Sequence, residues 1–328
     1  MSEEVTDTPR WRRRLPVALR ILLKFGIAPM LIGSLLGPVG AGPAATLGAV
    51  LAVGTAAMNG RRAALAAMPL VALAAGLGSW SKPGWPWVAV VTGFAVLSGL
   101  ATLRGIGVAA SQATLMAVIA PEVADGSRVM VLTGFVMAGS LYGLAMMHRA
   151  GASEPPKAPP RTPAFAAIAA IALGTAVGTA SSIAVATGWQ RATWAVGAVV
   201  VLGIPTPGLT EKLMIQRVIG QVGACGIVGG IALVTSNPIV LTGAGLLALV
   251  CYLMAIDQRG ARPIMWFTAA AMLPAAAATS PDVLIAQRLG FNLLGLAILL
   301  VVLAVVRLVT ERPARATATT APAATSAT

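Results

Sequence analysis

Charged side chains are scarce in this chain. They make up 10% of its 328 residues, whereas a soluble domain averages about 25%. The hydrophobic fraction is 57% and the mean hydropathy is +0.86, which does not fit one apolar core under a polar surface. It fits a protein whose outer surface faces lipid, where only helices or closed barrels satisfy the backbone. Because the apolar runs are long and continuous, they indicate helices.

Cysteine and histidine are also nearly lacking. Cys225 and Cys251 lie inside apolar runs, without the spacing of a metal site or of a disulfide framework. One histidine, His148, is too few for a metal cluster. The sequence contains no HExxH, no Walker A motif and no convincing nucleophile with its base. We therefore expect no metal, no cofactor and no enzymatic activity.

Twelve apolar segments follow one another, separated by glycine, proline and charge. A Pro-rich linker at 151–163 divides a half at 1–150 from a half at 164–310, and the tail at 311–328 has a disordered composition. We predict an all-α, polytopic transmembrane helix bundle of about twelve spans, arranged as two parallel six-helix repeats. The predicted spans are 17–37, 43–59, 63–80, 87–104, 106–121, 129–147, 164–187, 192–206, 217–235, 238–256, 263–280 and 285–309.

Two pairs of arginines suggest the repeat. Arg62 and Arg217 open the third and ninth spans, and Arg128 and Arg288 open the sixth and twelfth. The members of these pairs are 155 and 160 residues apart, and an apolar, small-residue helix follows each. The eighth span is short, and Ile204 to Gly208 is the clearest place for a helix break.

Positive charge is distributed unevenly between the predicted loops. With the N-terminus inside, 19 of the 23 Lys and Arg residues fall on the inner side. The four outer residues are Lys82, Arg128, Arg191 and Arg288. This asymmetry explains the net charge of +13 without nucleic acid, and it predicts both termini in the cytoplasm and an even number of spans. The Ala- and Gly-rich composition, with Arg preferred over Lys, indicates a bacterial source, so we expect a bacterial plasma-membrane protein. Tryptophans near two outer loops suit an interfacial belt.

Arg217 and Arg288 are the main candidates for contact with a solute. A charged group within a membrane usually faces an interior or an aqueous cavity, and a guanidinium matches a carboxylate. Most other basic residues are expected to extend to the interface. The candidate substrate-binding set is Arg217, Arg288, Gln216, Arg128 and Arg62.

Acidic residues are few, and none lies clearly in the middle of a span. Proton-coupled carriers often use an intramembrane acid or histidine. The candidates for such coupling are Glu211, Asp257 and His148 at the predicted inner ends of spans. The sequence leaves open whether transport is coupled at all.

Trp194, the stretch from Pro205 to Gly223 and the stretch from Ala286 to Gly295 carry a family resemblance. The order of a Trp opening a span, a polar turn and an Arg before a Gly-rich helix resembles the fusaric-acid-resistance-like (FUSC) membrane family. The resemblance is best over 165–305. It implies export or passive permeation of small organic anions, such as aromatic carboxylates. Larger exporters of this kind carry a soluble domain between the halves, and here only the short linker stands there.

Several alternatives stay open at this stage. A non-transporting scaffold or accessory protein of the cell envelope fits the lack of mid-span acids. A major-facilitator-type carrier also has two six-helix halves, although Asn59 to Arg62 is a poor version of its loop motif. The expected partners are the lipid bilayer and a small organic anion, and a homo-oligomer is compatible with the sequence.

Overall fold

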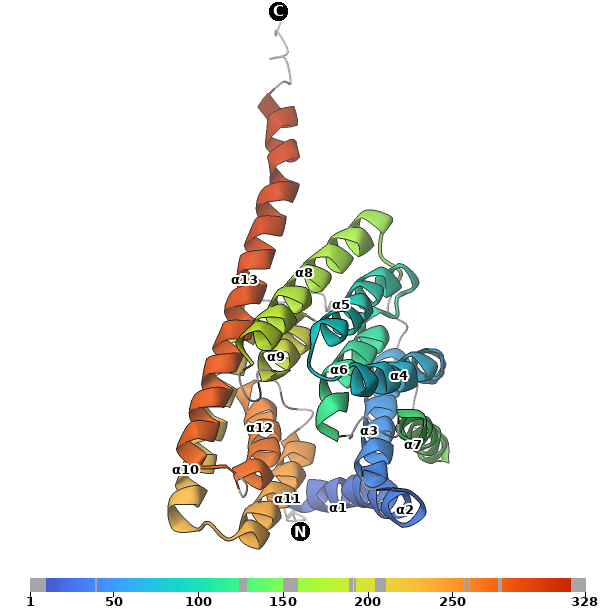
Figure 1. The fold of residues 1–328 in the computed structure, drawn as a ribbon, viewed down its shortest axis with the longest axis vertical. Helices are drawn as coiled ribbons and strands as arrows, with labels where there is room; N and C mark the ends of the chain where they lie inside the picture. Colours follow the sequence, from blue (N-terminus) through green and yellow to red (C-terminus); the bar gives the residue numbers. More distant parts are fainter. Residues whose placement is uncertain are drawn as a thin grey trace, which may run out of the picture.

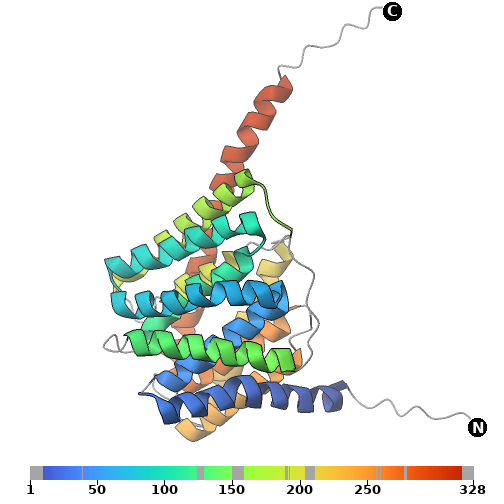
Figure 2. The same ribbon diagram turned by 90° about the vertical axis from the view of Figure 1, so that its right-hand side faces the viewer.

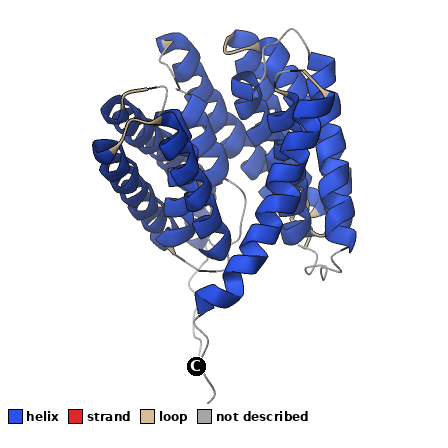
Figure 3. Ribbon diagram, turned by 90° about the horizontal axis from the view of Figure 1, so that it is seen from below, coloured by secondary structure: helices blue, strands red, loops and turns tan. Residues whose placement is uncertain are grey.

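The computed structural model describes residues 10–38, 40–123, 129–149, 159–188, 191, 193–203, 211–255, 258, 260–276 and 279–319. Within these ranges every regular element is a helix, as Figure 3 shows. The prediction of an all-α protein is therefore confirmed.

The first half contains α1 to α7. The elements are α1 (Arg10–Ile21), a π-helical turn η1 (Leu22–Ile27), α2 (Ala28–Leu36), α3 (Ala41–Asn59), α4 (Arg61–Ser81), α5 (Trp85–Leu100), a 3₁₀ turn η2 (Ala101–Arg104), α6 (Gly107–Val123) and α7 (Val129–Arg149). Glycines with positive φ end helices at tight turns: Gly60 separates α3 from α4, and Gly105 separates η2 from α6.

The second half contains α8 to α13 (Figure 1). The elements are α8 (Pro163–Thr187), α9 (Thr193–Gly203), α10 (Glu211–Val234), α11 (Pro238–Ala255), α12 (Ala261–Ala276) and α13 (Pro281–Thr319). Thr162 caps α8 by accepting a hydrogen bond from the backbone N–H of Phe165, and Pro163 suits the first helical position.

Each of the twelve predicted span ranges contains a helix. In the described part of the chain, nine helices are long and apolar enough to cross a membrane, and α6 and α9 are shorter apolar helices. Leucines such as Leu35 and Leu233 are more than four-fifths exposed, as expected of side chains that face lipid. The chain is therefore a multi-pass membrane protein, while the count of twelve crossings stays a prediction.

The C-terminal tail differs from its prediction. The sequence indicates disorder from residue 311, but α13 continues to Thr319. Ala and Arg in this segment favour a helix, whereas Pro313 adds no backbone hydrogen bond, so the extension does not follow from local propensity alone. The helix break predicted at Ile204 to Gly208 lies outside the described residues.

Helix contacts recur in the two halves. In the first half α3 packs on α7, α4 on α6 and α7, and α5 on α6. In the second half α9 packs on α13, α10 on α12 and α13, and α11 on α12. The halves meet chiefly where α5 packs on α8, and α1 makes the equivalent contact with α11. This order of contacts is what a duplication predicts, although the two-repeat origin itself stays a prediction.

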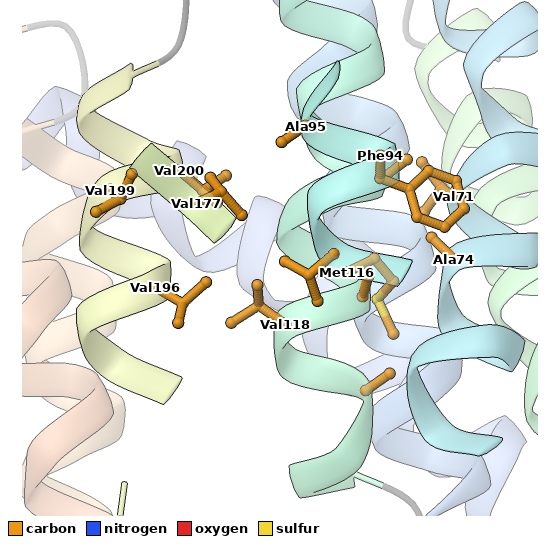
Figure 4. Packing of buried hydrophobic residues seen from close by; sticks show 14 of the residues in the cluster. Val71, Ala74, Phe94, Ala95, Met116, Val118, Val177, Val196, Val199 and Val200 are labelled. Atoms are coloured by element: carbon orange, nitrogen blue, oxygen red, sulfur yellow. The ribbon is translucent and has the colours of Figure 1, made fainter. Parts of the chain in front are cut away.

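An apolar core joins the halves. Val118 of α6 and Val196 of α9 face each other across the junction in Figure 4, and Met116, Val199 and Val200 belong to the same buried cluster. Leu299 of α13 is part of it as well. The junction between the halves is therefore packed with apolar side chains over this depth.

The helix ends define two ends of the bundle. In Figure 2, α1 begins and α7 ends on the same side. The turn at Gly60 between α3 and α4 belongs to that side, which we name the N-terminal end. The opposite side, with the α4–α5 turn and the first residues of α9 and α13, is named the pocket end for the reason given below.

Candidate functional site

A pocket of about 710 Å³ opens at the pocket end between the two halves. This volume falls within the range of small-molecule sites. The first half contributes the α4–α5 turn, the start of α5 and the end of α6. The second half contributes the end of α8, the start of α9, α12 and α13. The lining residues are Pro83, Trp87, Pro121, Glu122, Ala184, Val185, Arg191, Thr193, Trp194, Ala271, Met272, Ala275 and Arg288.

Two guanidinium groups approach one indole ring in this pocket. Cζ of Arg288 lies 4.7 Å from the ring centroid of Trp194, and Cζ of Arg191 lies 5.3 Å from it. Both distances are those of cation–π contacts. Trp194 therefore brings two positive charges together, although Arg288 comes from α13 and Arg191 from the α8–α9 turn.

Both arginines keep unused hydrogen-bonding capacity. Nε of Arg288 and Nη1 of Arg191 are buried, and neither has an acceptor within the described part of the chain. A buried donor without a partner costs free energy, more so when the group is charged. Because Arg191 and Arg288 both line the pocket, two charged guanidinium groups with unused donors lie where an anion could bind.

The backbone of Arg191 is strained. Its φ is +62°, in the left-handed region that side-chain-bearing residues seldom adopt. Its Nη2 donates to Oγ1 of Thr279 at 2.6 Å, and its carbonyl accepts from the backbone N–H of Trp194 at 2.9 Å. These contacts hold Arg191 between the α8–α9 and α12–α13 turns, and strain held in this way is common at binding sites.

Glu122 supplies negative charge at the exposed edge of the pocket. Its carboxylate accepts a hydrogen bond from Oγ1 of Thr193, which links the end of α6 to the start of α9. Among the lining residues, two arginines and one glutamate leave a formal charge of +1. That charge balance suits a monovalent anion.

Apolar side chains border the rest of the pocket. Trp87 and Met272 are fully buried there, and Nε1–H of Trp87 donates to the carbonyl of Ala117 at 3.0 Å. The half-buried side chains of Ala184 and Val185 supply accessible apolar surface. An apolar pocket with a few convergent charged groups is the usual form of a site for an organic ion.

The structure places the predicted substrate residues in different regions. Arg288 lines the pocket. Arg217 and Gln216 are half-buried on α10 away from it, and Nη1 of Arg217 donates to the carbonyl of Val201 at 2.7 Å. Arg62 is exposed at the N-terminal end. Arg128 lies outside the described residues.

The predicted coupling residues are not brought together with the pocket. His148 contacts Arg61 through its Nδ1 at the N-terminal end of the bundle. Glu211 begins α10, but its side chain is outside the described part of the chain, and so is the whole of Asp257. In the ranges that the structure describes, no three His, Cys, Asp or Glu side chains are grouped closely enough to hold a metal ion.

Sequence reasoning missed Arg191, Glu122 and Thr193 as site residues. A usable signal exists for Arg191, because it is one of four basic residues on the predicted outer side and stands three residues before Trp194. The same signal selects Arg288. No sequence signal connects Glu122 to either arginine, since they meet only through the packing of α6 against α9.

The comparisons with known proteins agree with the resemblance seen in the sequence. No curated protein and no solved structure matches the chain. The family model described as fusaric acid resistance protein-like matches residues 178–302. This range begins in α8, ends in α13 and includes Arg191, Trp194 and Arg288. The match confirms, over these residues, that this multi-pass membrane protein resembles the fusaric-acid-resistance-like family.

Proposed function

We propose that the protein transports small organic anions across a bacterial plasma membrane, and that the pocket between the halves binds the anion. Aromatic monocarboxylates are the proposed substrate class, moved by export or by passive permeation. The proposal includes twelve spans in two parallel repeats and termini in the cytoplasm. In that orientation the pocket opens to the outside.

One observation carries the proposal. Two guanidinium groups stack on Trp194 inside a pocket of about 710 Å³, and each keeps a buried N–H group without an acceptor. Buried charge at membrane depth is costly, so it marks a functional site by default. A carboxylate would accept from both arginines, and an aromatic ring would lie against the accessible apolar surface of Ala184 and Val185.

A non-transporting scaffold or accessory protein is the alternative. A scaffold needs surfaces for partners, whereas it has no use for a concave site with unsatisfied charged donors. It would therefore tolerate loss of either arginine as long as the chain folds. This difference separates the two functions experimentally.

The test uses purified protein in detergent and in proteoliposomes with radiolabelled benzoate. We expect Arg288→Gln and Arg191→Gln to weaken benzoate binding by roughly 10- to 100-fold, because a hydrogen bond to a charged group contributes about 1.5–3 kcal/mol. Flux at a fixed low concentration should fall in parallel. Arg62→Gln is the matched control, since Arg62 is exposed at the opposite end of the bundle.

Flux should be measured with and without an imposed pH gradient, which separates coupled from passive movement. Equal binding and flux in wild type, Arg288→Gln and Arg191→Gln, at equal yield of monodisperse protein, would contradict the proposed site. A wild-type protein that folds but neither binds nor moves any aromatic acid would favour the scaffold.

A further inference from the structure

Polar side chains continue inward from the pocket along the contact between α10 and α13. The two helices run antiparallel, because Gly229 of α10 faces Ile285 while Gln221 faces Asn292. Arg288, at the pocket, and Asn292 are one turn apart on α13. Gln221 and Arg217 are one turn apart on α10. We name these four residues the polar track.

Hydrogen bonds connect the middle of the track. Nδ2 of Asn292 donates to the carbonyl of Arg288 at 2.6 Å. The amides of Gln221 and Asn292 exchange two hydrogen bonds, each 3.4 Å long. These are long for amide hydrogen bonds, whose usual length is near 2.9 Å, so the amide pair separates at little cost.

The track extends well into the membrane. Since Gln221 lies opposite Asn292 and the helices are antiparallel, Arg217 lies opposite Leu296, two turns beyond Arg288. At 1.5 Å per residue this is about 12 Å along the helix axis. Beyond the amide pair, the guanidinium of Arg217 binds the carbonyl of Val201 near the end of α9. The track therefore has a cationic group at each end and two amides between them.

The first half of the chain provides an internal comparison. A Cβ placed on Gly139 would lie 2.0 Å from the carbonyl oxygen of Ala45, and a Cβ on Gly295 would lie 2.6 Å from that of Ala195. A Cβ on Gly76 would meet Val129 at 3.4 Å, as one on Gly229 would meet Ile285 at 3.3 Å. These matching contacts align α7 with α13 and α4 with α10.

Under this alignment the positions of the track are apolar in the first half. Ala64 and Met68 of α4 correspond to Arg217 and Gln221, and Leu132 and Val136 of α7 correspond to Arg288 and Asn292. The arginine pairs that suggest the repeat in the sequence are therefore not at equivalent positions in these helix contacts. Ala64, Leu132 and Val136 are buried. The equivalent helix contact in the first half thus forms with apolar side chains at all four of these positions, so packing alone does not explain the track.

The other route inward from the pocket is closed. Below Trp194, the junction between the halves is filled by the apolar cluster around Val118 and Val196 (Figure 4). At the depth of Val118 and Val196 an anion would lose its hydration without gaining a donor. The hydroxyl groups of Ser98, Ser111 and Thr114 lie only beyond this layer, around a small cavity. Along the track, donors follow one another at intervals of one helical turn.

We propose that the polar track is the path by which the anion leaves the pocket, passing from Arg288 through the Asn292 and Gln221 amides to Arg217. This inference rests on the proposed anion transport. Several weak sites in series let an ion enter and also let it leave, as conduction requires. The closed amide pair is the narrow point of the path, and its separation admits the anion.

The experiment separates binding from transport. We expect Gln221→Leu and Asn292→Leu to bind benzoate within about twofold of wild type, because the pocket is untouched, while benzoate flux in proteoliposomes falls at least tenfold. The exchanged pair Gln221→Asn with Asn292→Gln should regain much of the flux. Val222→Leu is the control on α10, since Val222 is exposed beside Gln221 and lies outside the track, and it should keep wild-type flux.

If a leucine variant fails to fold, a second measurement tests whether the anion reaches the polar track. Gln221→Cys, in a background with Cys225→Ala and Cys251→Ala, should react with a small anionic thiol reagent, and benzoate should slow this reaction. Wild-type flux in Gln221→Leu and Asn292→Leu, or no reaction at Gln221→Cys, would overturn the polar track while leaving the pocket in place. Failure of the wild type to bind benzoate would instead overturn the proposed function on which the track rests.

Discussion

Trp194 is the residue on which the geometry of the pocket depends most. It lies at the start of α9 and contacts the guanidinium groups of Arg191 and Arg288. Neither arginine is near the other in sequence, so the indole ring is what sets their relative position. All three residues are visible in the sequence, but their contacts are not, because Arg191 lies in a turn and Arg288 lies on a helix about 100 residues later.

Replacement of Trp194 tests this role. We expect Trp194→Leu to weaken benzoate binding about fivefold or more, because each cation–π contact contributes about 1 kcal/mol and the arginines lose their common support. Trp194→Phe should retain part of the affinity, since a ring face remains. Equilibrium binding of radiolabelled benzoate measures the effect. Trp80→Leu is the control, since Trp80 is exposed and outside the pocket, and an equal loss in that variant would contradict a specific role for Trp194.

At the scale of helices, small residues decide how closely the elements approach. The glycines of α10 illustrate this, because the sequence predicts a packing seam along Gly220, Gly223, Gly226, Gly229 and Gly230. A Cβ on Gly220 would lie 2.7 Å from the carbonyl oxygen of Ala261, and one on Gly223 would lie 2.9 Å from the sulfur of Met265. Gly226 and Gly230 have open space instead. Close packing is therefore confirmed at Gly220 and Gly223 but not at Gly226 and Gly230. The spacing of the glycines in the sequence does not distinguish the two groups.

Among the described glycines, Gly139 is the one at which an added Cβ would come closest to a neighbouring atom. We expect Gly139→Ala to lower the stability by about 1–3 kcal/mol or more, because the new methyl group would meet the backbone of Ala45 at 2.0 Å and force α3 and α7 apart. The thermal midpoint in detergent, followed by loss of monodisperse protein, reports the change. Gly134→Ala, on the same helix with open space around it, should leave the midpoint unchanged or raise it. Equal midpoints for the two variants would contradict the close contact.

At the scale of the whole molecule, the two described ends of the bundle differ in charge. The N-terminal end carries Arg61, Arg62, His148 and Arg149, whereas the pocket end carries Lys82, Arg191 and Arg288, two of which line the pocket. From the positive-inside rule we expect the N-terminal end to lie in the cytoplasm. The pocket would then face outward, and the proposed polar track would lead from it toward the cytoplasm.

Cysteine labelling in intact cells tests this orientation. In a background with Cys225→Ala and Cys251→Ala, we expect Lys82→Cys at the pocket end to react with a membrane-impermeant maleimide added outside. Arg149→Cys should react only after the membrane is permeabilised. If both positions react from the same side, the predicted orientation or the even number of crossings is wrong.

The amino-acid sequence by itself determined the class of the protein. Continuous apolar runs with few charges require helices in lipid, since each helix satisfies its own backbone, and this conclusion does not depend on how the helices pack. Each predicted span range accordingly contains a helix, and the resemblance over the second half is visible in the order of Trp194, Arg217 and Arg288. Helix ends do not follow from hydropathy in the same way, and α13 continues past its predicted end to Thr319 although Pro313 lies in the extension.

Only the tertiary structure decided which polar residues meet. It brought Arg191, Glu122 and Arg288 around one pocket from three separate elements, and it left Arg62 exposed at the far end. It also set Gln221 beside Asn292, 71 residues away in sequence. Hydropathy and spacing fix which residues lie along one helix, whereas the rotation and pairing of helices depend on close contacts such as those at Gly139 and Gly295. Because these contacts form between distant segments, they set the site without leaving a local pattern in the sequence.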